Sequence, residues 1–295
     1  MMLKIKVPAS TANMGPGFDV LALSFKLYNE FIFEDSKELI INTPNKRYNN
    51  KNNLVYRTLV QILEEKGIEA PALKLTMRNE IPISRGLGSS ATCILAGVIA
   101  ANRYLKKKMT TEEIYLKAVA IEGHCDNISS QFFGGLTLSM REEDRIFYRK
   151  ANIPSGLLCT ALIPDFTLST KKARAVLPET VSLTDATYNL SHAMLFVESL
   201  KNGQFKDLKY FLKDKLHEPY RSSLIPNFDR IIQKAYDLGA YGAFLSGAGP
   251  TIMILRKNEE NSFKKNIQNY LHTLEDQWKA VDLSIDNEGT IISQD

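Results

Sequence analysis

A segment rich in glycine and serine, Pro82-Ile-Ser-Arg-Gly-Leu-Gly-Ser-Ser-Ala91, could hold the phosphate groups of a ligand. Gly86 and Gly88 have no Cβ, so the backbone can bend there and come close to a ligand. Ser89 and Ser90 stand at the start of a predicted helix, where unpaired amides attract an anion. The spacing fits neither G-x-x-x-x-G-K-S/T nor G-x-G-x-x-G. Glycine spacing alone therefore leaves two interpretations open: a phosphate loop, or a connector whose serines cap the helix.

A second cluster of polar residues lies in Glu122-Gly-His-Cys-Asp-Asn127, ahead of Phe133-Gly-Gly135. A lone glutamate here would be typical of a helix surface, but its polar neighbours favour a functional site. The four histidines and three cysteines have no metal-ligand spacing, so no zinc site is expected. The other histidines lack a partner motif and are interpreted as structural residues of predicted helices: His192, His217 and His272.

The elements that must position these segments follow from hydrophobic periodicity and turn residues. In the first half, strands are predicted over 3–9, 29–33, 73–78, 136–140 and 145–149, and helices over 54–66, over 91–105 and from 110 or 111 onward. The stretch 42–53 has no apolar period and is predicted to be a surface loop.

The second half begins after a candidate domain boundary at 151–156, which contains proline and glycine. Its predicted elements are strands over 157–163, 242–246, 251–256 and pieces of 280–293, with helices near 184–202, 204–216 and 226–238 and one more before the last strands. Strands and helices mix without strict alternation, so the α+β class is predicted. The expected domains are 1–152 and 153–295.

Bulk composition limits the classes of function. A chain of 295 residues suggests two domains, and 44% hydrophobic with 24% charged residues is typical of a folded protein. The net charge of +4 is mild and the basic residues are scattered, which argues against nucleic-acid binding. No apolar stretch is long enough to span a membrane, and no signal peptide is recognisable. Widely spaced cysteines predict reduced thiols, and a cytoplasmic location is expected.

Three separated segments together resemble the GHMP family of small-molecule kinases. Pro8-Ala-Ser-Thr-Ala-Asn-Met-Gly-Pro-Gly-Phe-Asp19 resembles the first motif of its homoserine-kinase branch, 82–91 the phosphate loop, and Ser246-Gly-Ala-Gly-Pro-Thr251 the third motif. The 122–127 block with Phe133-Gly-Gly135 resembles a further homoserine-kinase block. Motif order, spacing and total length all agree, so the resemblance covers essentially the whole chain.

Two departures from the family pattern are visible. Cys125 stands where proline or another residue is usual, and Ser129-Ser130-Gln131 replaces an apolar stretch that is usually Ala-Pro-Ala. Neither touches a residue that must carry charge, so we expect them to change local loop shape more than activity. The opening Ser10-Thr-Ala-Asn13 argues against mevalonate, diphosphocytidyl-methylerythritol and archaeal shikimate kinases. A catalytically silent binding protein of this fold is disfavoured because the phosphate loop and Glu122 are intact.

The resemblance implies ATP-dependent phosphorylation of the hydroxyl of L-homoserine, in threonine biosynthesis. It also implies an N-terminal nucleotide-binding domain, a C-terminal ferredoxin-like domain and a possible homodimer. Amides of 86–90 would hold the nucleotide phosphates, and the residues expected to bind ATP are Pro82, Ile83, Ser84, Arg85, Gly86, Leu87, Gly88, Ser89, Ser90, Ala91 and Thr92. Ser90 and Glu122 would hold Mg²⁺, which prefers such hard oxygen ligands.

The resemblance also implies an amino-acid site. Arg174 and Arg221 would bind the carboxylate of the substrate, and Asp19 its ammonium. Asn13, His124 and Asn127 would orient the substrate and its hydroxyl; Asn13, Asn127 and Glu122 are the expected catalytic residues. No dedicated general base is implied: the γ-phosphate would accept the hydroxyl proton, and Asp19 is the alternative base.

Overall fold

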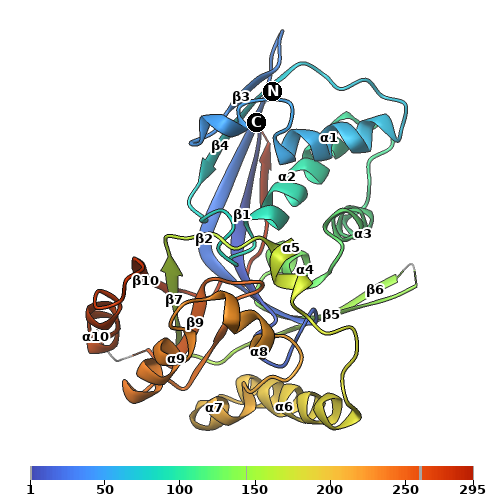
Figure 1. Cartoon of the computed structure of the whole chain (residues 1–295). Coiled ribbons are helices and arrows are strands. Elements are labelled where there is room, and N and C mark those ends of the chain that lie inside the picture. Colours follow the sequence, from blue (N-terminus) through green and yellow to red (C-terminus); the bar gives the residue numbers. More distant parts are fainter. Residues whose placement is uncertain (1, 144, 259–260, 295) are drawn as a thin grey trace.

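The computed structural model describes residues 2–143, 145–258 and 261–294, which form two β-sheets with helices packed against them (Figure 1). A long antiparallel ribbon runs through the first sheet. Its strands β1 (Met2–Ala12) and β2 (Leu21–Asp35) pair from Met2↔Glu34 to Ala12↔Ala22, with a bulge between Pro8 and Ala9. In the outer half of β1, buried and partly exposed side chains alternate, as a strand with one covered face requires.

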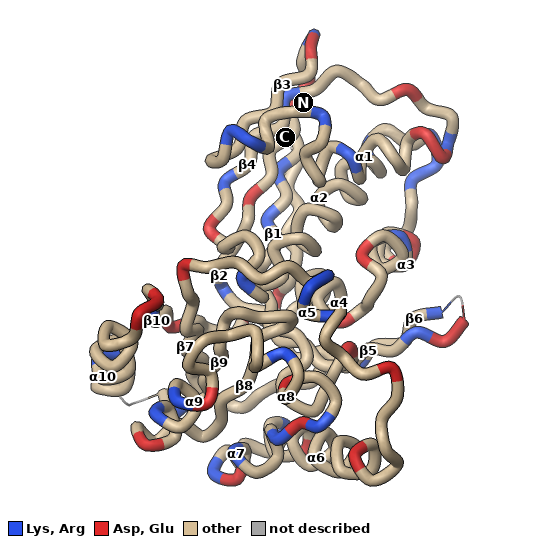
Figure 2. The backbone as a smooth tube through the Cα atoms, viewed as in Figure 1, with Lys and Arg blue, Asp and Glu red and all other residues tan. Residues whose placement is uncertain are grey.

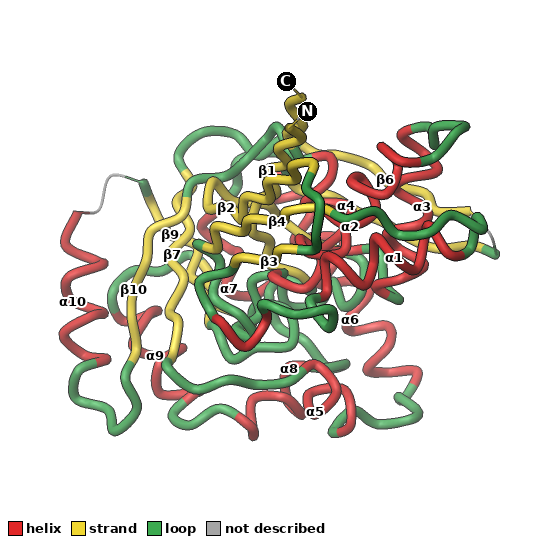
Figure 3. The backbone as a smooth tube through the Cα atoms, turned by 90° about the horizontal axis from the view of Figure 1, so that it is seen from above, coloured by secondary structure: helices red, strands yellow, loops and turns green. Residues whose placement is uncertain are grey.

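The first sheet has the order β11-β1-β2-β4-β3, and a hairpin branches from it. The remaining strands are β3 (Ile40–Asn42), β4 (Leu73–Asn79), the hairpin β5 (Leu136–Glu142) and β6 (Arg145–Ala151), and β11 (Ile291–Gln294). Its helices are α1 (Leu54–Glu64), α2 (Ser89–Tyr104), α3 (Thr111–Glu122) and α4 (Asp126–Phe133). Seen from above, these helices lie together on one side of the strands (Figure 3).

The second sheet is wholly antiparallel, in the order β10-β7-β9-β8. Its strands are β7 (Leu157–Pro164), β8 (Gly242–Leu245), β9 (Ile252–Lys257) and β10 (Trp278–Leu283). The longer helices of this part are α6 (Leu183–Lys201), α9 (Phe228–Asp237) and α10 (Asn261–Leu271). One buried cluster joins alternate residues of this sheet to α9 and α10, and another joins it to α6 and to β1 and β2. The second cluster therefore holds the two parts together.

The structure corrects several sequence predictions. The helix expected over 204–216 is too long: the chain forms a 3₁₀ turn, η2 (Phe205–Asp207), followed by one short helix, α7 (Leu208–Phe211), and is not helical over 212–216. Three helices were not predicted, namely α4, α5 (Thr170–Ala175) and α8 (Glu218–Arg221). They are short, and periodicity is a weak signal over one or two turns.

The proposed boundary at 152/153 separates the strands of the two sheets, except for the last one. β11 returns to the first sheet and pairs antiparallel with β1, from Lys6↔Ile291 to Leu3↔Gln294. Residues 291–294 are thus assigned by sequence to the second domain but lie in the first sheet. The N- and C-terminal ends are consequently neighbours (Figure 1).

Charged residues of both signs are distributed over both parts of the molecule (Figure 2). Among the residues that the structure describes, no helix combines the length and apolar character needed to cross a membrane.

Candidate active site

A cavity of about 330 Å³ lies where the end of β1, the phosphate loop, the start of α4 and the 246–251 loop meet. Residues from both halves of the chain line it: Ala12, Asn13, Asp19, Thr43, Tyr48, Asn53, Leu54, Met77, Asn79, Ile83, Ser84, Arg85, Gly86, Gly88, Ser89, Ser90, Cys93, Glu122, His124, Asp126, Asn127, Leu168, Thr170, Arg174, Arg221, Gly247, Ala248 and Gly249. The cavity therefore contains the three resembled motifs and the 122–127 block.

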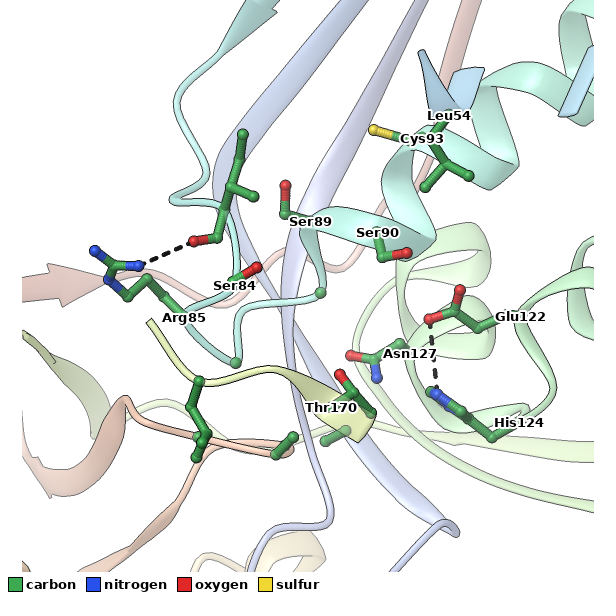
Figure 4. Close-up of a pocket in the computed structure, with 18 of the residues that line it drawn as sticks. Leu54, Ser84, Arg85, Ser89, Ser90, Cys93, Glu122, His124, Asn127 and Thr170 are labelled. Atoms are coloured by element: carbon green, nitrogen blue, oxygen red, sulfur yellow. Dashed lines mark hydrogen bonds and ion pairs between the residues drawn. The ribbon is translucent and has the colours of Figure 1, made fainter. Parts of the chain in front are cut away.

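The phosphate loop leads into helix α2, whose N-terminus has no side-chain cap. Gly88 adopts a left-handed conformation (φ 72°) as the N-cap of α2, and no side chain accepts a hydrogen bond from the first turn. Ser89 and Ser90 follow at the cavity wall (Figure 4). The orphaned amides and the helix dipole make this terminus suitable for an anion, because α2 is a sixteen-residue, largely buried helix. The expectation that serines cap this helix is wrong, because its N-cap is Gly88 and Ser89 and Ser90 lie inside its first turn.

The third motif packs directly against the phosphate loop. Ser246 Oγ donates to Gly86 O (2.6 Å) and lies 2.8 Å from Thr11 Oγ1, while Thr251 N donates to Arg85 O (3.2 Å). A Cβ on Gly86, whose φ is 78°, would overlap the carbonyl oxygen of Ser246. The expected approach of 246–251 to the phosphate loop is thus confirmed, and the glycine is required by that contact.

Not every residue expected to bind ATP reaches the cavity. Seven line it, and four of the predicted residues contribute to packing instead: Pro82, Leu87, Ala91 and Thr92. Arg85 lines the cavity, but its guanidinium donates to three backbone carbonyls, those of Pro164 (2.8 Å), Ile83 (3.2 Å) and Asp165. Arg85 therefore ties the phosphate loop to the end of β7.

Glu122, at the end of α3, is a carboxyl in a mostly buried position. Burial, and then the charge of Asp126, raise its pKa to about 7, although His124 and a hydrogen bond from Ser90 act in the opposite direction. A carboxylate in such surroundings gains strongly from a bound cation. The His124 ring lies 3.7 Å from Glu122 Oε1 through Nε2 (Figure 4) and 2.6 Å from Asp126 Oδ1 through Nδ1.

His124 carries a positive charge more readily than an ordinary histidine. Burial opposes its protonation, but the hydrogen bond and charge of Asp126, together with Glu122 and Asp19, more than compensate and raise its pKa. Asp126 itself is 1% exposed and also accepts from Asn127 N (2.7 Å). The sequence analysis quoted Asp126 inside its motif but assigned it no role; the structure places it at the centre of this polar cluster.

The donor set of this corner suits Mg²⁺. Ser90 and Glu122 supply a hydroxyl and a carboxylate on the cavity wall, beside the helix terminus suited to phosphates. Among the described residues there is no group of three or more His, Cys, Asp or Glu that could hold a metal by itself. A magnesium ion held by one or two protein oxygens completes its octahedral shell with phosphate oxygens and water. The residues present therefore fit magnesium brought in with a nucleotide.

Three charged side chains meet at another part of the cavity wall, near enough to the 122–127 block to influence its charges. Arg174, on α5, forms a two-pronged ion pair with Asp19: Nη1 lies 3.1 Å from Oδ2 and Nη2 3.0 Å from Oδ1. Arg221 is 1% exposed, and burial, with the charge of Arg174, lowers its pKa to about 10, so it stays protonated at neutral pH. The structure thus brings together all three residues expected to hold a zwitterion.

Arg221 is held by a buried scaffold that the sequence analysis missed. His217, interpreted as a structural residue of a helix, precedes α8; its Nε2 lies 2.8 Å from Gly15 O and its Nδ1 3.5 Å from Arg221 Nη1. Because a carbonyl can only accept, Nε2 carries the hydrogen and Nδ1 faces the guanidinium as an acceptor. Burial lowers the pKa of His217, which keeps the ring neutral. The rings of His217 and Phe18 stack at 5.1 Å.

The expected catalytic asparagines have different surroundings. Asn13 Nδ2 donates to Gly247 O (2.8 Å), and its Oδ1 accepts from Asp19 N (3.0 Å). Asn13 and Asp19 both have positive φ, a strained conformation that these bonds stabilise. Asn127 lies at the start of α4 and points into the cavity near Glu122 and His124 (Figure 4).

Another stretch of the cavity wall was predicted to be only a surface loop. Thr43, Tyr48 and Asn53 of this stretch line the cavity together with Leu54 and Cys93. Their mixture of apolar surface and amide groups suits a planar base. A loop without periodicity gives no signal that its residues fold over a helix start, so the sequence could not show this.

Comparisons with known proteins agree with this geometry. The family model "GHMP kinases N terminal domain" matches residues 53–135, and "GHMP kinases C terminal" matches 196–272. A homoserine kinase of Clostridium botulinum is 41% identical over 293 residues, with 99% of each chain covered. The chain belongs to the GHMP kinase family.

Solved structures add to this assignment. The GHMP kinase fold described here matches a homoserine kinase of Cytophaga hutchinsonii with a TM-score of 0.85 at 27% identity, covering 99% of this chain and 97% of that one. A protein described as a putative homoserine kinase from Listeria monocytogenes matches at 0.81 and 26% identity, covering 99% and 100%. The predicted two-domain α+β GHMP kinase fold is confirmed, and the protein is an ATP-dependent kinase.

Proposed function

We propose that this GHMP kinase transfers the γ-phosphoryl group of ATP to the side-chain hydroxyl of L-homoserine, which forms O-phospho-L-homoserine for threonine biosynthesis. The observation that carries the proposal is the grouping of Asp19, Arg174 and Arg221 in the same cavity that the phosphate loop lines. One carboxylate and two guanidinium groups match the ammonium and carboxylate of an α-amino acid. The homoserine kinases that resemble the chain along its whole length support the same substrate.

Substrate binding exchanges one ion pair for two. Asp19 and Arg174 neutralise each other across the cavity wall, at 35% and 41% side-chain exposure. The ammonium of the substrate would take over Asp19, and its carboxylate would bind the Arg174 guanidinium and the buried Arg221. An uncharged alcohol such as a sugar offers neither partner, so these residues discriminate between classes of acceptor.

Phosphoryl transfer mainly requires positioning and charge neutralisation. Amides at the start of α2 would bind the phosphates, and Ser90 and Glu122 would hold Mg²⁺, which supplies additional charge neutralisation when bound. We assign Asp19 to the ammonium because its carboxylate already faces a guanidinium. The hydroxyl proton would then pass to the γ-phosphate.

The decisive experiment is a coupled assay of ADP release by the purified protein with ATP and Mg²⁺. L-Homoserine is the test acceptor, and mevalonate, shikimate and L-threonine are run alongside. We expect saturable release with L-homoserine alone and O-phosphohomoserine as product. ATP binding without release in the presence of homoserine would overturn the substrate assignment, while the family assignment would stand.

Two further parts of the proposal concern the metal and assembly. Replacing Mg²⁺ by excess EDTA should abolish release, and adding Mg²⁺ should restore it. A homodimer is a further prediction, which light scattering of the full chain at micromolar concentration tests.

The division into domains 1–152 and 153–295 is also a prediction, and limited proteolysis tests it.

A further inference from the structure

Gln131 links the phosphate loop to Asn127, which is expected to orient the acceptor hydroxyl. This residue belongs to the Ser129-Ser130-Gln131 departure, on the buried side of α4, and is 0% exposed. Its Nε2 lies 2.9 Å from Gly88 O and 2.9 Å from Ser10 Oγ. Ser10 Oγ in turn lies 2.7 Å from Asn127 Oδ1. The three side chains therefore form a continuous chain of hydrogen bonds from Gly88 to Asn127.

The direction of every hydrogen bond in this chain is determined at its first member. Gly88 O can only accept, so the amide nitrogen of Gln131 must face it and not the amide oxygen. The other hydrogen of that nitrogen is directed to Ser10 Oγ, which leaves the Ser10 hydroxyl hydrogen for Asn127 Oδ1. The nitrogen of the Asn127 amide, Nδ2, is consequently free to donate into the cavity. Its distance of 3.4 Å from the acceptor Asp126 Oδ1 agrees with this orientation of the amide.

Two independent observations indicate that this chain has a purpose beyond packing. Gln131 Oε1 is buried and has no hydrogen-bond partner among the described residues. An unsatisfied buried acceptor is costly, and an apolar side chain would avoid that cost. Second, a Cβ on Gly88 would overlap Gln131 Nε2 and Ser10 Oγ and crowd Asn127 Oδ1. The phosphate-loop glycine and the chain are therefore fitted to each other.

We propose that Gln131 is a positioning residue that acts through Ser10 to make Asn127 present its NH₂ group to the acceptor hydroxyl. In this orientation Asn127 donates to the hydroxyl oxygen and cannot accept its proton. The hydroxyl hydrogen is thereby left to point at the phosphate group held by the loop that Gln131 also contacts. The proposal rests on the function proposed above and deepens it.

The test measures kcat and KM separately in two variants that interrupt this chain of hydrogen bonds. Ser10→Ala removes the donor to Asn127 and leaves the bond between Gln131 and Gly88. We expect kcat to fall about tenfold, while the KM for ATP stays within twofold of the natural value. Gln131→Met keeps the length of the side chain but removes both donors, so it should lower kcat similarly and also raise the KM for ATP several-fold.

Ser129→Ala is the matched control for Ser10→Ala, because both serines are fully buried. The hydroxyl of Ser129, on α4, contacts the Tyr115 hydroxyl and the Cys125 carbonyl and is not part of the chain. Ser129→Ala should lower the melting temperature without changing kcat. The double variant Ser10→Ala/Gln131→Met should lose no more kcat than either single variant, because both interrupt one chain.

Values of kcat within twofold of natural in both single variants would overturn the proposal, as would losses that multiply in the double variant. If Gln131→Met does not fold, Ser10→Ala decides, since it removes a single hydroxyl. Failure of the proposed function would appear differently, as absence of homoserine turnover by the natural protein. In that case the affinity for ATP would test the chain of hydrogen bonds: Gln131→Met should weaken ATP binding and Ser10→Ala should not.

Discussion

At the scale of single residues, substrate binding depends on how exposed each charged side chain of the cavity is. Asp19 is exposed enough to exchange partners, whereas Arg221 is buried and held by His217 and backbone carbonyls. The exchangeable group should therefore control affinity for the amino acid, and the buried one should act as a permanent anchor.

Asp19→Asn tests the ammonium site. The amide keeps the shape of the side chain but loses its charge, so the KM for L-homoserine should rise by roughly 30- to 100-fold while kcat falls less than fivefold. The KM for ATP in the same assay is the internal control. An unchanged homoserine KM with a large loss of kcat would instead identify Asp19 as the base.

Glu122 should make magnesium binding depend on pH. Its pKa of about 7 means that a proton competes with the metal near neutrality. Below pH 7 the half-saturating Mg²⁺ concentration should rise up to tenfold per pH unit, and above pH 8 it should level off. Glu122→Gln should require far more Mg²⁺ and lose this pH dependence, whereas Glu112→Gln, at the exposed start of the same helix, should behave like the natural protein. A pH-independent natural protein would contradict the assignment.

At the scale of elements, the phosphate loop is held in shape by an element from the other half of the chain. Ser246 and the loop that follows it press against Gly86 so closely that no Cβ fits. The loop geometry is therefore a property of two elements in contact and not of the glycine-serine segment alone.

Gly86→Ala should separate these two elements. Because it adds both an overlap with Ser246 and a strained positive φ, it should raise the KM for ATP at least tenfold and destabilise the fold by roughly 2–4 kcal/mol. Gly67→Ala is the matched control, since Gly67 has a similar φ of 65° but nothing within 4 Å of the added Cβ. It should cost only about 1 kcal/mol in unfolding and leave the KM for ATP unchanged. Equal KM values for ATP in the two variants would contradict the claim that the contact between Ser246 and Gly86 shapes the ATP site.

At the scale of the whole molecule, the two halves share a core and a cavity, and the second half holds the carboxyl of Glu218 against the end of β8. Glu218 Oε2 accepts from Leu245 N at 2.7 Å, and burial raises the pKa of Glu218 to about 8. A carboxyl whose pKa is raised by folding weakens the fold as pH rises from its unfolded value, near 4.5, to its folded value.

Glu218→Gln should remove this penalty while retaining an acceptor for Leu245 N. The variant and the natural protein should be equally stable near pH 4.5, and the variant should be more stable by on the order of 2–4 kcal/mol at pH 8. Urea unfolding at several pH values measures the difference. The exposed Glu275→Gln control should show no such trend, and a constant difference across pH would contradict the burial argument.

The amino-acid sequence by itself was enough to identify the polar segments and most of the elements that carry them. The phosphate loop and the 122–127 block are local patterns, each recognisable within about a dozen residues, and the order of the motifs can be read along the chain without a structure. Arg174 and Arg221 were named through resemblance and not through any local signal, and both line the cavity.

Only the tertiary structure decided the directions in which these groups face. Arg85 donates to carbonyls near β7, the 42–53 loop forms part of the cavity, and Gln131 reaches Ser10 across 121 positions of sequence. Hydrogen-bond direction depends on which acceptor lies opposite each donor, and the partners here come from distant elements. A sequence pattern records which groups are present, whereas their orientation is determined by the folded neighbours that they contact.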